Sequence, residues 1–312
     1  MLSNAEIMSN AWKAGVAIPA FNVPYLPMVE PMIRAVADQD SFAFIATARV
    51  EWTKFDARGP DAVIAEFRKW DNPAHVRIHL DHVPVIDEDA LRVDFLSIIG
   101  KAIDLGYGSV MVDASRLDLA GNIEATRQVA EMAHEAGIPC ESELGAVMGH
   151  EAGPLPPYEE LYESGMGFTD VEEARRFARE SGCDWLSVAI GNIHGAVSGV
   201  LRDAKKVEAR LNIHHLNRLR EAAGLPLVLH GGSGVKQEYV LRAIKAGIAK
   251  INVGTDIRQA YEVALRKSGN VADAQDAVYE RTSWTIRDQL RLAGTQRVVT
   301  GITGLSCPDS PA

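Results

Sequence analysis

Short apolar, β-branched runs alternate along the chain with longer stretches in which apolar residues recur at helical spacing. Runs of this length and composition are typical of buried strands. We expect eight strands, at residues 16–21, 42–47, 76–82, 109–113, 140–145, 184–191, 227–232 and 250–255. Helical patterns fill the intervals, most clearly at residues 94–107, 122–137, 171–182 and 238–247. Each of these four patterns reaches a glycine, the residue that most often follows a helix end.

This alternation predicts a parallel sheet with right-handed crossover helices. Eight such units fit the size of a (β/α)8 barrel, about 250 residues, so we expect one α/β TIM barrel domain over residues 1–312. The domain should carry a C-terminal helical extension at residues 270–300 and a frayed polar tail at residues 303–312. An open doubly wound sheet is the alternative. It usually has a glycine-rich turn after its first strand, whereas "NVPYLPM" follows here.

Two segments interrupt the regular alternation. Residues 148–167, after the fifth strand, are rich in glycine and proline and cannot form one regular element. They are long enough to serve as a lid over an active site. Residues 194–212, after the sixth strand, form a second insertion.

Composition excludes several classes of protein. The net charge is −10, so the chain lacks the basic surface that binds nucleic acid or an anionic membrane. The sequence contains no run of about 18 apolar residues, the length that can span a membrane. The first residues lack the apolar core of a signal peptide. The three cysteines, Cys140, Cys183 and Cys307, are far apart, which fits a reducing compartment. We therefore expect a cytoplasmic protein.

Polar residues stand at the ends of six consecutive predicted strands. In a barrel these ends and the loops after them form the active site. A chance scatter of polar residues would not follow the strand ends, so the pattern predicts an active site at the mouth of the barrel. From the third strand to the eighth, the residues are Asp81, His82, Asp113, Glu143, His194, His230, Asn252, Thr255 and Asp256.

Three of these residues, His82, His194 and His230, are histidines and suggest a metal site. Neutral imidazoles suit zinc, and three protein ligands with one open position are typical of catalytic zinc. A single histidine at a strand end is more often just hydrogen-bonded, so this hypothesis depends on the set. His79 precedes Asp81 by two residues and shares its face of the strand, so we expect it to pack or hydrogen-bond inside the barrel.

Two glycine-rich segments predict a phosphate site. "HGGSG" (residues 230–234) and "NVGTD" (residues 252–256) each lead into a predicted helix. Backbone N–H groups at a helix N-terminus bind anions well. Barrels often hold phosphate with the loops after strands seven and eight. The two segments together favour a substrate that carries phosphate.

The motifs "HLDH", "SVMVDAS", "ESELG", "AIGNIHG", "LHGGSG" and "KINVGTD", in this order, resemble the class II (zinc-dependent) ketose-bisphosphate aldolases. The similarity covers residues 11–266 and includes "IPAFNV" near the N-terminus. It implies reversible cleavage of a ketose (bis)phosphate, such as fructose or tagatose bisphosphate, to dihydroxyacetone phosphate and an aldehyde through a zinc-stabilised enediolate. It also implies one catalytic Zn²⁺, a monovalent cation (Na⁺ or K⁺) near the phosphate, and a homodimer or homotetramer.

The resemblance also implies roles for individual residues. Asp81 would be the acid/base at the aldehyde oxygen, and Glu151, in "GHEAG", would remove the α-proton of the bound ketone. As neighbours on a strand, Asp81 and His82 should point to different sides and so divide proton transfer from metal binding. The zinc ligands would be His82, His194 and His230, with Asp113 and Glu143 behind them or at an alternative metal position. The donor and its phosphate would contact Gly195, Gly231, Ser233, Asn252, Thr255 and Asp256.

The chain departs from the family pattern at two places. Ser198 stands where the family usually has a phosphate-binding lysine, and "TARVEWTKF" replaces a Ser-x-Gly pattern after the second strand. The second segment is either a solvated loop or a rebuilt pocket in which Arg49 clamps a different anionic or bulky group. In the latter case the substrate would be another sugar or a sugar acid. A non-catalytic accessory subunit is a third hypothesis, but such a protein would be expected to lose zinc ligands.

Overall fold

The computed structural model describes residues 2–145, 157–192 and 208–301. Eight parallel strands close into a barrel in sequence order, with β1 paired to β8, so the predicted TIM barrel is confirmed and the open sheet is excluded. The strands are β1 (Ile18–Asn22), β2 (Ala43–Thr47), β3 (Val76–Pro84), β4 (Val110–Asp113), β5 (Cys140–Leu144), β6 (Trp185–Val188), β7 (Leu227–Leu229) and β8 (Ile248–Val253).

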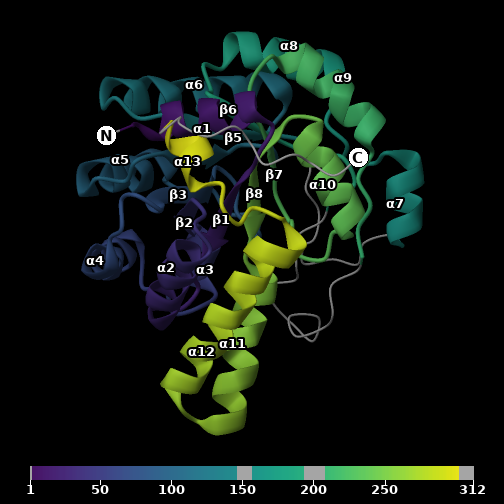
Figure 1. Cartoon of the computed structure of the whole chain (residues 1–312). Coiled ribbons are helices and arrows are strands. Elements are labelled where there is room, and N and C mark those ends of the chain that lie inside the picture. Colours follow the sequence, from purple (N-terminus) through teal and green to yellow (C-terminus); the bar gives the residue numbers. More distant parts are fainter. Residues whose placement is uncertain (1, 146–156, 193–207, 302–312) are drawn as a thin grey trace.

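Helices surround the barrel (Figure 1). Within the described residues none of them combines the length and the apolar character that crossing a membrane requires. Those before β5 are α1 (Asn4–Ala14), η1 (Leu26–Met28), α2 (Val29–Asp38), α3 (Arg49–Thr53), α4 (Pro60–Trp70), α5 (Phe95–Leu105) and α6 (Leu119–Glu135). Those after β5 are α7 (Tyr158–Ser164), α8 (Val171–Glu180), α9 (Ile213–Ala223), α10 (Gln237–Lys245), α11 (Thr255–Ser268), α12 (Val271–Trp284), the π-helical turn η3 (Thr285–Gln289) and α13 (Gln296–Thr300).

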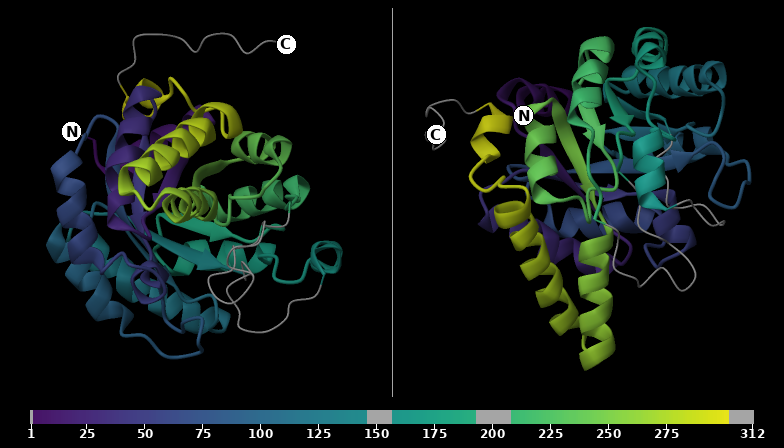
Figure 2. Two further views of the ribbon diagram at one scale, coloured as in Figure 1. Left: turned by 90° about the horizontal axis from the view of Figure 1, so that it is seen from below. Right: turned by 90° about the vertical axis from the view of Figure 1, so that its right-hand side faces the viewer.

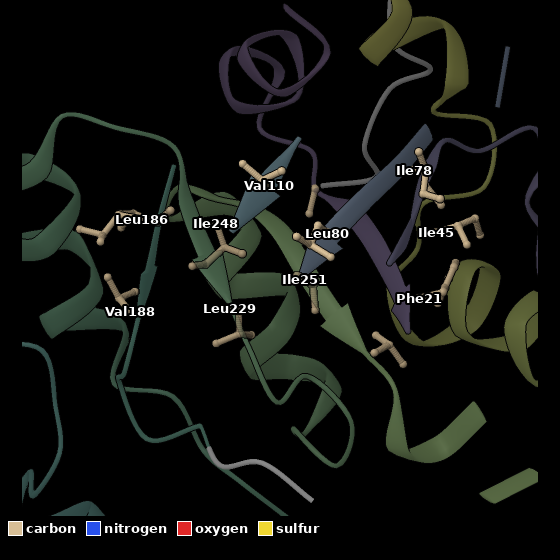
Figure 3. Packing of buried hydrophobic residues seen from close by; sticks show 14 of the residues in the cluster. Phe21, Ile45, Ile78, Leu80, Val110, Leu186, Val188, Leu229, Ile248 and Ile251 are labelled. Atoms are coloured by element: carbon tan, nitrogen blue, oxygen red, sulfur yellow. The ribbon is translucent and has the colours of Figure 1, made fainter. Parts of the chain in front are cut away.

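The larger apolar core lies between the strands and the surrounding helices. Its members include Leu80, Val110, Leu229 and Ile251, which are fully buried on neighbouring strands (Figure 3). Because helices cover the outside of a parallel barrel, its strands are buried on both faces. This explains why the strands read in the sequence as nearly continuous apolar runs.

A smaller apolar core fills the half of the barrel interior that lies near the N-terminal ends of the strands. Ile18, Phe44 and Trp185 point inward and pack with Ile7 and Met8 of α1. Helix α1 is well defined at both ends: Ser3 and Glu6 form a capping box, and Gly15 ends the helix with a φ of 65°. With α1 and these apolar side chains closing one end, the inward-facing polar residues gather toward the other end, the mouth.

The C-terminal helices lie outside the barrel repeat. Helices α11 and α12 form an antiparallel hairpin that projects well beyond the barrel (Figures 1 and 2). Helix α12 also packs against α2, and α13 returns to α1 at the closed end. Helix α11 starts directly after β8, so the hairpin begins at the mouth of the barrel.

Candidate active site

The mouth of the barrel brings together residues from β3 and from the loop after β7. The imidazole rings of His82 and His230 lie edge to face, with centroids 4.3 Å apart. Asp81, His82 and His230 each offer one ligand atom, and these atoms lie within 4.8 Å of one another. The structure therefore brings His230 next to Asp81 and His82, which are far from it in the sequence, and joins three of the predicted site residues in one cluster.

A β-bulge in β3 explains how the adjacent Asp81 and His82 both reach this cluster. Leu80 pairs with Val110 of β4, whereas Val83 pairs with Val112, so β3 contains one more residue than its partner over this interval. A bulge turns side chains away from the regular alternation. The expectation that Asp81 and His82 point to different sides is therefore wrong, because it assumed a regular strand.

Carboxylates surround both histidines. The Nδ1 atom of His82 lies 3.3 Å from Asp113 Oδ2. His230 faces a carboxylate at each ring nitrogen, Glu141 at 2.9 Å from Nε2 and Glu143 at 3.0 Å from Nδ1. Asp113 and Glu143 thus lie beside the histidines, as expected for residues close to a metal site.

These carboxylates make the pocket favour positive charge. Burial lowers the pKa of His82, but Asp81, the hydrogen bond with Asp113, and Glu143 outweigh burial and raise this pKa to about 10. Burial and the neighbouring His82 lower the pKa of His230, but its bonds to Glu141 and Glu143 raise it overall. A site that stabilises cationic imidazoles this strongly would also stabilise a divalent cation.

Asp81 is held by two asparagine side chains. The Asn22 amide donates to Asp81 Oδ2 at 2.9 Å, and the Asn252 amide lies 2.9 Å from both carboxylate oxygens. The side chain is 1 % exposed. Burial alone would raise its pKa, but Lys250 and the nearby histidines lower the pKa of Asp81 well below its usual value. Asp81 is therefore a fixed, ionised carboxylate beside the two histidines.

Below this cluster lies a buried ion pair, Lys250 and Glu141, that could not be identified from the sequence. Lys250 of β8 pairs with Glu141 of β5 at 2.8 Å, and His79 lies 3.5 Å from the same carboxylate. As predicted, His79 packs inside the barrel, where its Nδ1 lies 2.8 Å from the Ser109 hydroxyl and its ring contacts Trp185. Burial raises the pKa of Glu141, but Lys250, the hydrogen bond to His230, and His79 lower it to about 2.

The glycine-rich loops after β7 and β8 lie against each other. Gly232 N–H donates to Asn252 O at 3.0 Å, and a Cβ atom at Gly232 would lie 2.6 Å from the Ile251 side chain. Ser233 Oγ accepts from the backbone N–H of Asp256 at 3.4 Å, in the first turn of α11. Gly231 adopts a left-handed φ of 64°. Thr255 is the first residue of α11, whereas α10 begins only at Gln237.

The segment after β2 forms the short helix α3. Arg49 Nη1 lies 3.1 Å from Asp87 Oδ2, so its guanidinium is engaged with the protein. Glu51 is buried and accepts from the Ala48 N–H at 2.6 Å, and burial raises the pKa of Glu51 well above its usual value. A small cavity of about 50 Å³ lies beside His82, with walls formed by Val50, His82, Pro84, Ile86, Glu88, Asp113 and Arg116.

Four predicted or noted residues, Glu151, His194, Gly195 and Ser198, lie outside the described residues. The third histidine and the loop glutamate therefore stay predictions from the sequence. The described donor set already suits a metal such as zinc, because it combines two imidazoles with a carboxylate. Each imidazole also has a carboxylate partner at one ring nitrogen: Asp113 at Nδ1 of His82 and Glu141 at Nε2 of His230. A carboxylate at the nitrogen that does not bind the metal is the usual arrangement around metal-binding histidines.

Comparisons with known proteins find a matching family model and similar solved structures. The family model described as "Fructose-bisphosphate aldolase class-II" matches residues 3–303. The YdjI aldolase from Escherichia coli K12 is 29% identical, with a TM-score of 0.74 over 95% of this chain and 100% of that one. A Coccidioides immitis protein provisionally described as a fructose-1,6-biphosphate aldolase is 25% identical, with a TM-score of 0.74 over 95% and 98%. The fructose-bisphosphate aldolase from Campylobacter jejuni, 18% identical with a TM-score of 0.69 over 94% and 96%, shares the fold.

Proposed function

Since the chain belongs to the class II fructose-bisphosphate aldolase family and is thus an aldolase, a carbon–carbon lyase, we propose that it cleaves a phosphorylated ketose reversibly to dihydroxyacetone phosphate and an aldehyde. The observation that carries this proposal is the convergence of Asp81, His82 and His230 at the barrel mouth. The proposal includes three further properties that the family resemblance implies. They are a homodimeric or homotetrameric state, a cytoplasmic location, and a monovalent cation bound near the phosphate.

The metal in this proposal is a zinc ion held by His82, His230 and His194. When bound, such an ion acts as a Lewis acid that stabilises the negative charge developing on the substrate oxygens. Asp113 faces Nδ1 of His82 and would orient that ring, whereas Glu143 beside Nδ1 of His230 would stand at an alternative metal position.

Asp81 is proposed to move the proton at the aldehyde end of the substrate. In cleavage it accepts the proton of the hydroxyl on the carbon that becomes the aldehyde, while the carbon–carbon bond breaks. In condensation it returns that proton. Its low pKa keeps it ionised at neutral pH, ready to accept. The amides of Asn22 and Asn252 fix the carboxylate, so that little reorganisation is needed when the substrate binds.

The other half of the substrate is proposed to bind at the loops after β7 and β8. Gly231, Ser233, Thr255 and Asp256 stand at the start of α11 or in the loop packed against it, where N–H groups can hold the phosphate. Glu151 is proposed to exchange the α-proton of the ketone, and Gly195 to contact the donor, as the family resemblance implies.

A test that needs no knowledge of the aldehyde is proton exchange in dihydroxyacetone phosphate. Metal-loaded protein in D2O should exchange one carbon-bound proton, seen by NMR, and EDTA should stop the exchange. Restoring zinc to the EDTA-treated sample should restore the rate. No exchange from metal-loaded protein would overturn dihydroxyacetone phosphate as the donor product.

A second candidate is aldol cleavage of a different sugar or a sugar acid. Two observations favour it: α3 occupies the position after β2 where the family usually has Ser-x-Gly, and the cavity beside His82 includes the cationic Arg116. Arg49 is held by Asp87 at the edge of this region and could turn toward an anionic group. Replacing Arg49 by Ala should raise KM for the true aldehyde, whereas an unchanged KM would exclude Arg49 from the pocket. An accessory subunit is disfavoured, because the chain retains all three histidines.

A further inference from the structure

Lys250 is fully buried inside the barrel, directly under the proposed metal site. Its Nζ lies 2.9 Å from Glu141 Oε1, 2.8 Å from Glu141 Oε2 and 3.6 Å from Asp81 Oδ1. A buried ammonium is costly unless it is paired with carboxylates. The chain places this cation between two carboxylates that each contact the site, and the proposed chemistry gives it no role.

The same place has the donor atoms of a cation site. His79, Asp81 and Glu141 offer ligand atoms that lie within 4.8 Å of one another. The Lys250 ammonium contacts two of these residues, Asp81 and Glu141, and so supplies positive charge where a second cation would otherwise bind. Lys250 is thus a fixed internal cation that neutralises part of the negative charge beneath the site.

Glu141 connects Lys250 to His230. One oxygen of Glu141 lies 2.9 Å from both the Lys250 ammonium and His230 Nε2. A metal-binding histidine needs an acceptor for its other N–H, which fixes the tautomer and the ring orientation. With Glu141 accepting from Nε2–H, Nδ1, which faces Glu143, is the nitrogen available for a metal.

We propose that Lys250 is a positioning residue that acts on the metal site through Glu141, by holding the carboxylate that fixes the tautomer of His230. The inference rests on the proposed function only in assigning a metal to His82 and His230. It makes no assumption about the substrate.

The direction of the effect separates positioning from simple electrostatics. The positive charge of Lys250 repels a divalent ion, so removing it should tighten metal binding if charge alone mattered. If Lys250 holds Glu141 in place, removing it should weaken metal binding instead. The two explanations therefore predict opposite signs for one measured quantity.

The experiment compares Lys250→Met, Glu141→Gln and the double variant in the full-length protein. Zinc affinity of EDTA-treated protein is measured by competition with a chromogenic chelator, and circular dichroism reports folding and Tm. Each single variant should bind zinc about 10–100-fold more weakly, the usual effect of losing an outer partner of a metal ligand. The double variant should bind no more weakly than the worse single variant, because both changes break the same chain of contacts.

Two control variants test for indirect effects. Lys101→Met removes an exposed lysine on α5 and should change neither zinc affinity nor Tm. Ser109→Ala removes the buried partner of His79 on the other side of the network and should lower Tm without weakening zinc binding. The visible spectrum of the Co²⁺-loaded protein should change in the Lys250 and Glu141 variants and stay unchanged in the Ser109 variant.

Zinc binding by Lys250→Met that equals or exceeds that of the wild type would overturn the inference. If Lys250→Met does not fold, Glu141→Gln decides, since unchanged zinc affinity in that variant would equally overturn it. Failure of the proposed function looks different: the wild type would bind zinc and the variants would lose it, but dihydroxyacetone phosphate would not exchange. A wild type that binds no zinc would refute both.

Discussion

Binding of a divalent ion to the metal-free protein should release at least about one proton even at pH 8. A metal takes the neutral imidazole, so any proton on the ring must leave. In the metal-free protein Asp81, Asp113 and Glu143 raise the pKa of His82 to about 10 in spite of its burial. The proton that the metal displaces is therefore held far more tightly than on an ordinary histidine.

The size of the effect follows from this pKa. At pH 8 a group with a pKa of about 10 is ~99% protonated, whereas a histidine with the usual pKa of about 6.5 is ~3% protonated. Displacing this proton costs about 2.7 kcal/mol at pH 8, which lowers the apparent metal affinity roughly 100-fold. A pKa one unit lower would still leave ~90% of His82 protonated.

Isothermal titration calorimetry can count the protons. Zinc or cobalt is titrated into EDTA-treated protein at pH 8, in two non-chelating buffers with different ionisation enthalpies, and the difference in apparent enthalpy gives the number released. Asp113→Asn removes the partner of His82 Nδ1 and should release fewer protons. Ionisation of a metal-bound water would also release a proton, but that release would persist in the variant. A release near zero in the wild type would refute the reasoning.

Three further outcomes follow from the described contacts. Asp81→Asn should lower kcat by about 10²–10⁴-fold, the usual effect of losing a positioned acid or base, and a kcat within tenfold of the wild type in steady-state assays would exclude that role. The metal-free protein should lose stability as the pH falls below 4.5, because Glu141 has a folded pKa of about 2 and so stabilises only while ionised. That contribution is roughly 3 kcal/mol, and denaturant titrations at pH 6 and pH 3 should show a smaller difference for Glu141→Gln. Gly232→Ala should destabilise by about 1–3 kcal/mol through overpacking, since its Cβ would lie 2.6 Å from a neighbouring side chain. Gly100→Ala, whose new Cβ on α5 would meet only an ordinary 3.6 Å contact, should be neutral or stabilising in the same thermal scans.

The barrel could be predicted from the sequence because its strands are buried on both faces. Each of the eight expected runs overlaps an observed strand. The ends of the strands are harder to predict, since glycines allow several conformations. The seventh strand ends at Leu229 and not at Gly232, because the glycines form the loop that packs on β8. The eighth begins at Ile248, two residues before the expected start at Lys250.

The part of the site at the barrel mouth could also be predicted, because the C-terminal ends of all strands in a barrel lie at the same end of it. Asp81, His82 and His230 came from that rule. Lys250 and Glu141 did not, because their partnership joins residues 109 positions apart and exists only once the barrel closes. One signal was present: Glu141 stands two residues before Glu143, so both had to face the interior. The bulge in β3 left no mark in the sequence.

That bulge limits how this chemistry can be transferred or redesigned. Removing one residue between Leu80 and Val83 would restore regular pairing with β4, but the two residues there are Asp81 and His82, so the site would lose either its carboxylate or one of its imidazoles. An Asp-His pair copied into an idealised barrel strand without this bulge would fail because neighbouring side chains alternate, so one of the two would turn into the helix layer. Substrate specificity can therefore change through substitutions and insertions in the loops, whereas the number of residues in β3 must stay the same for this site to form.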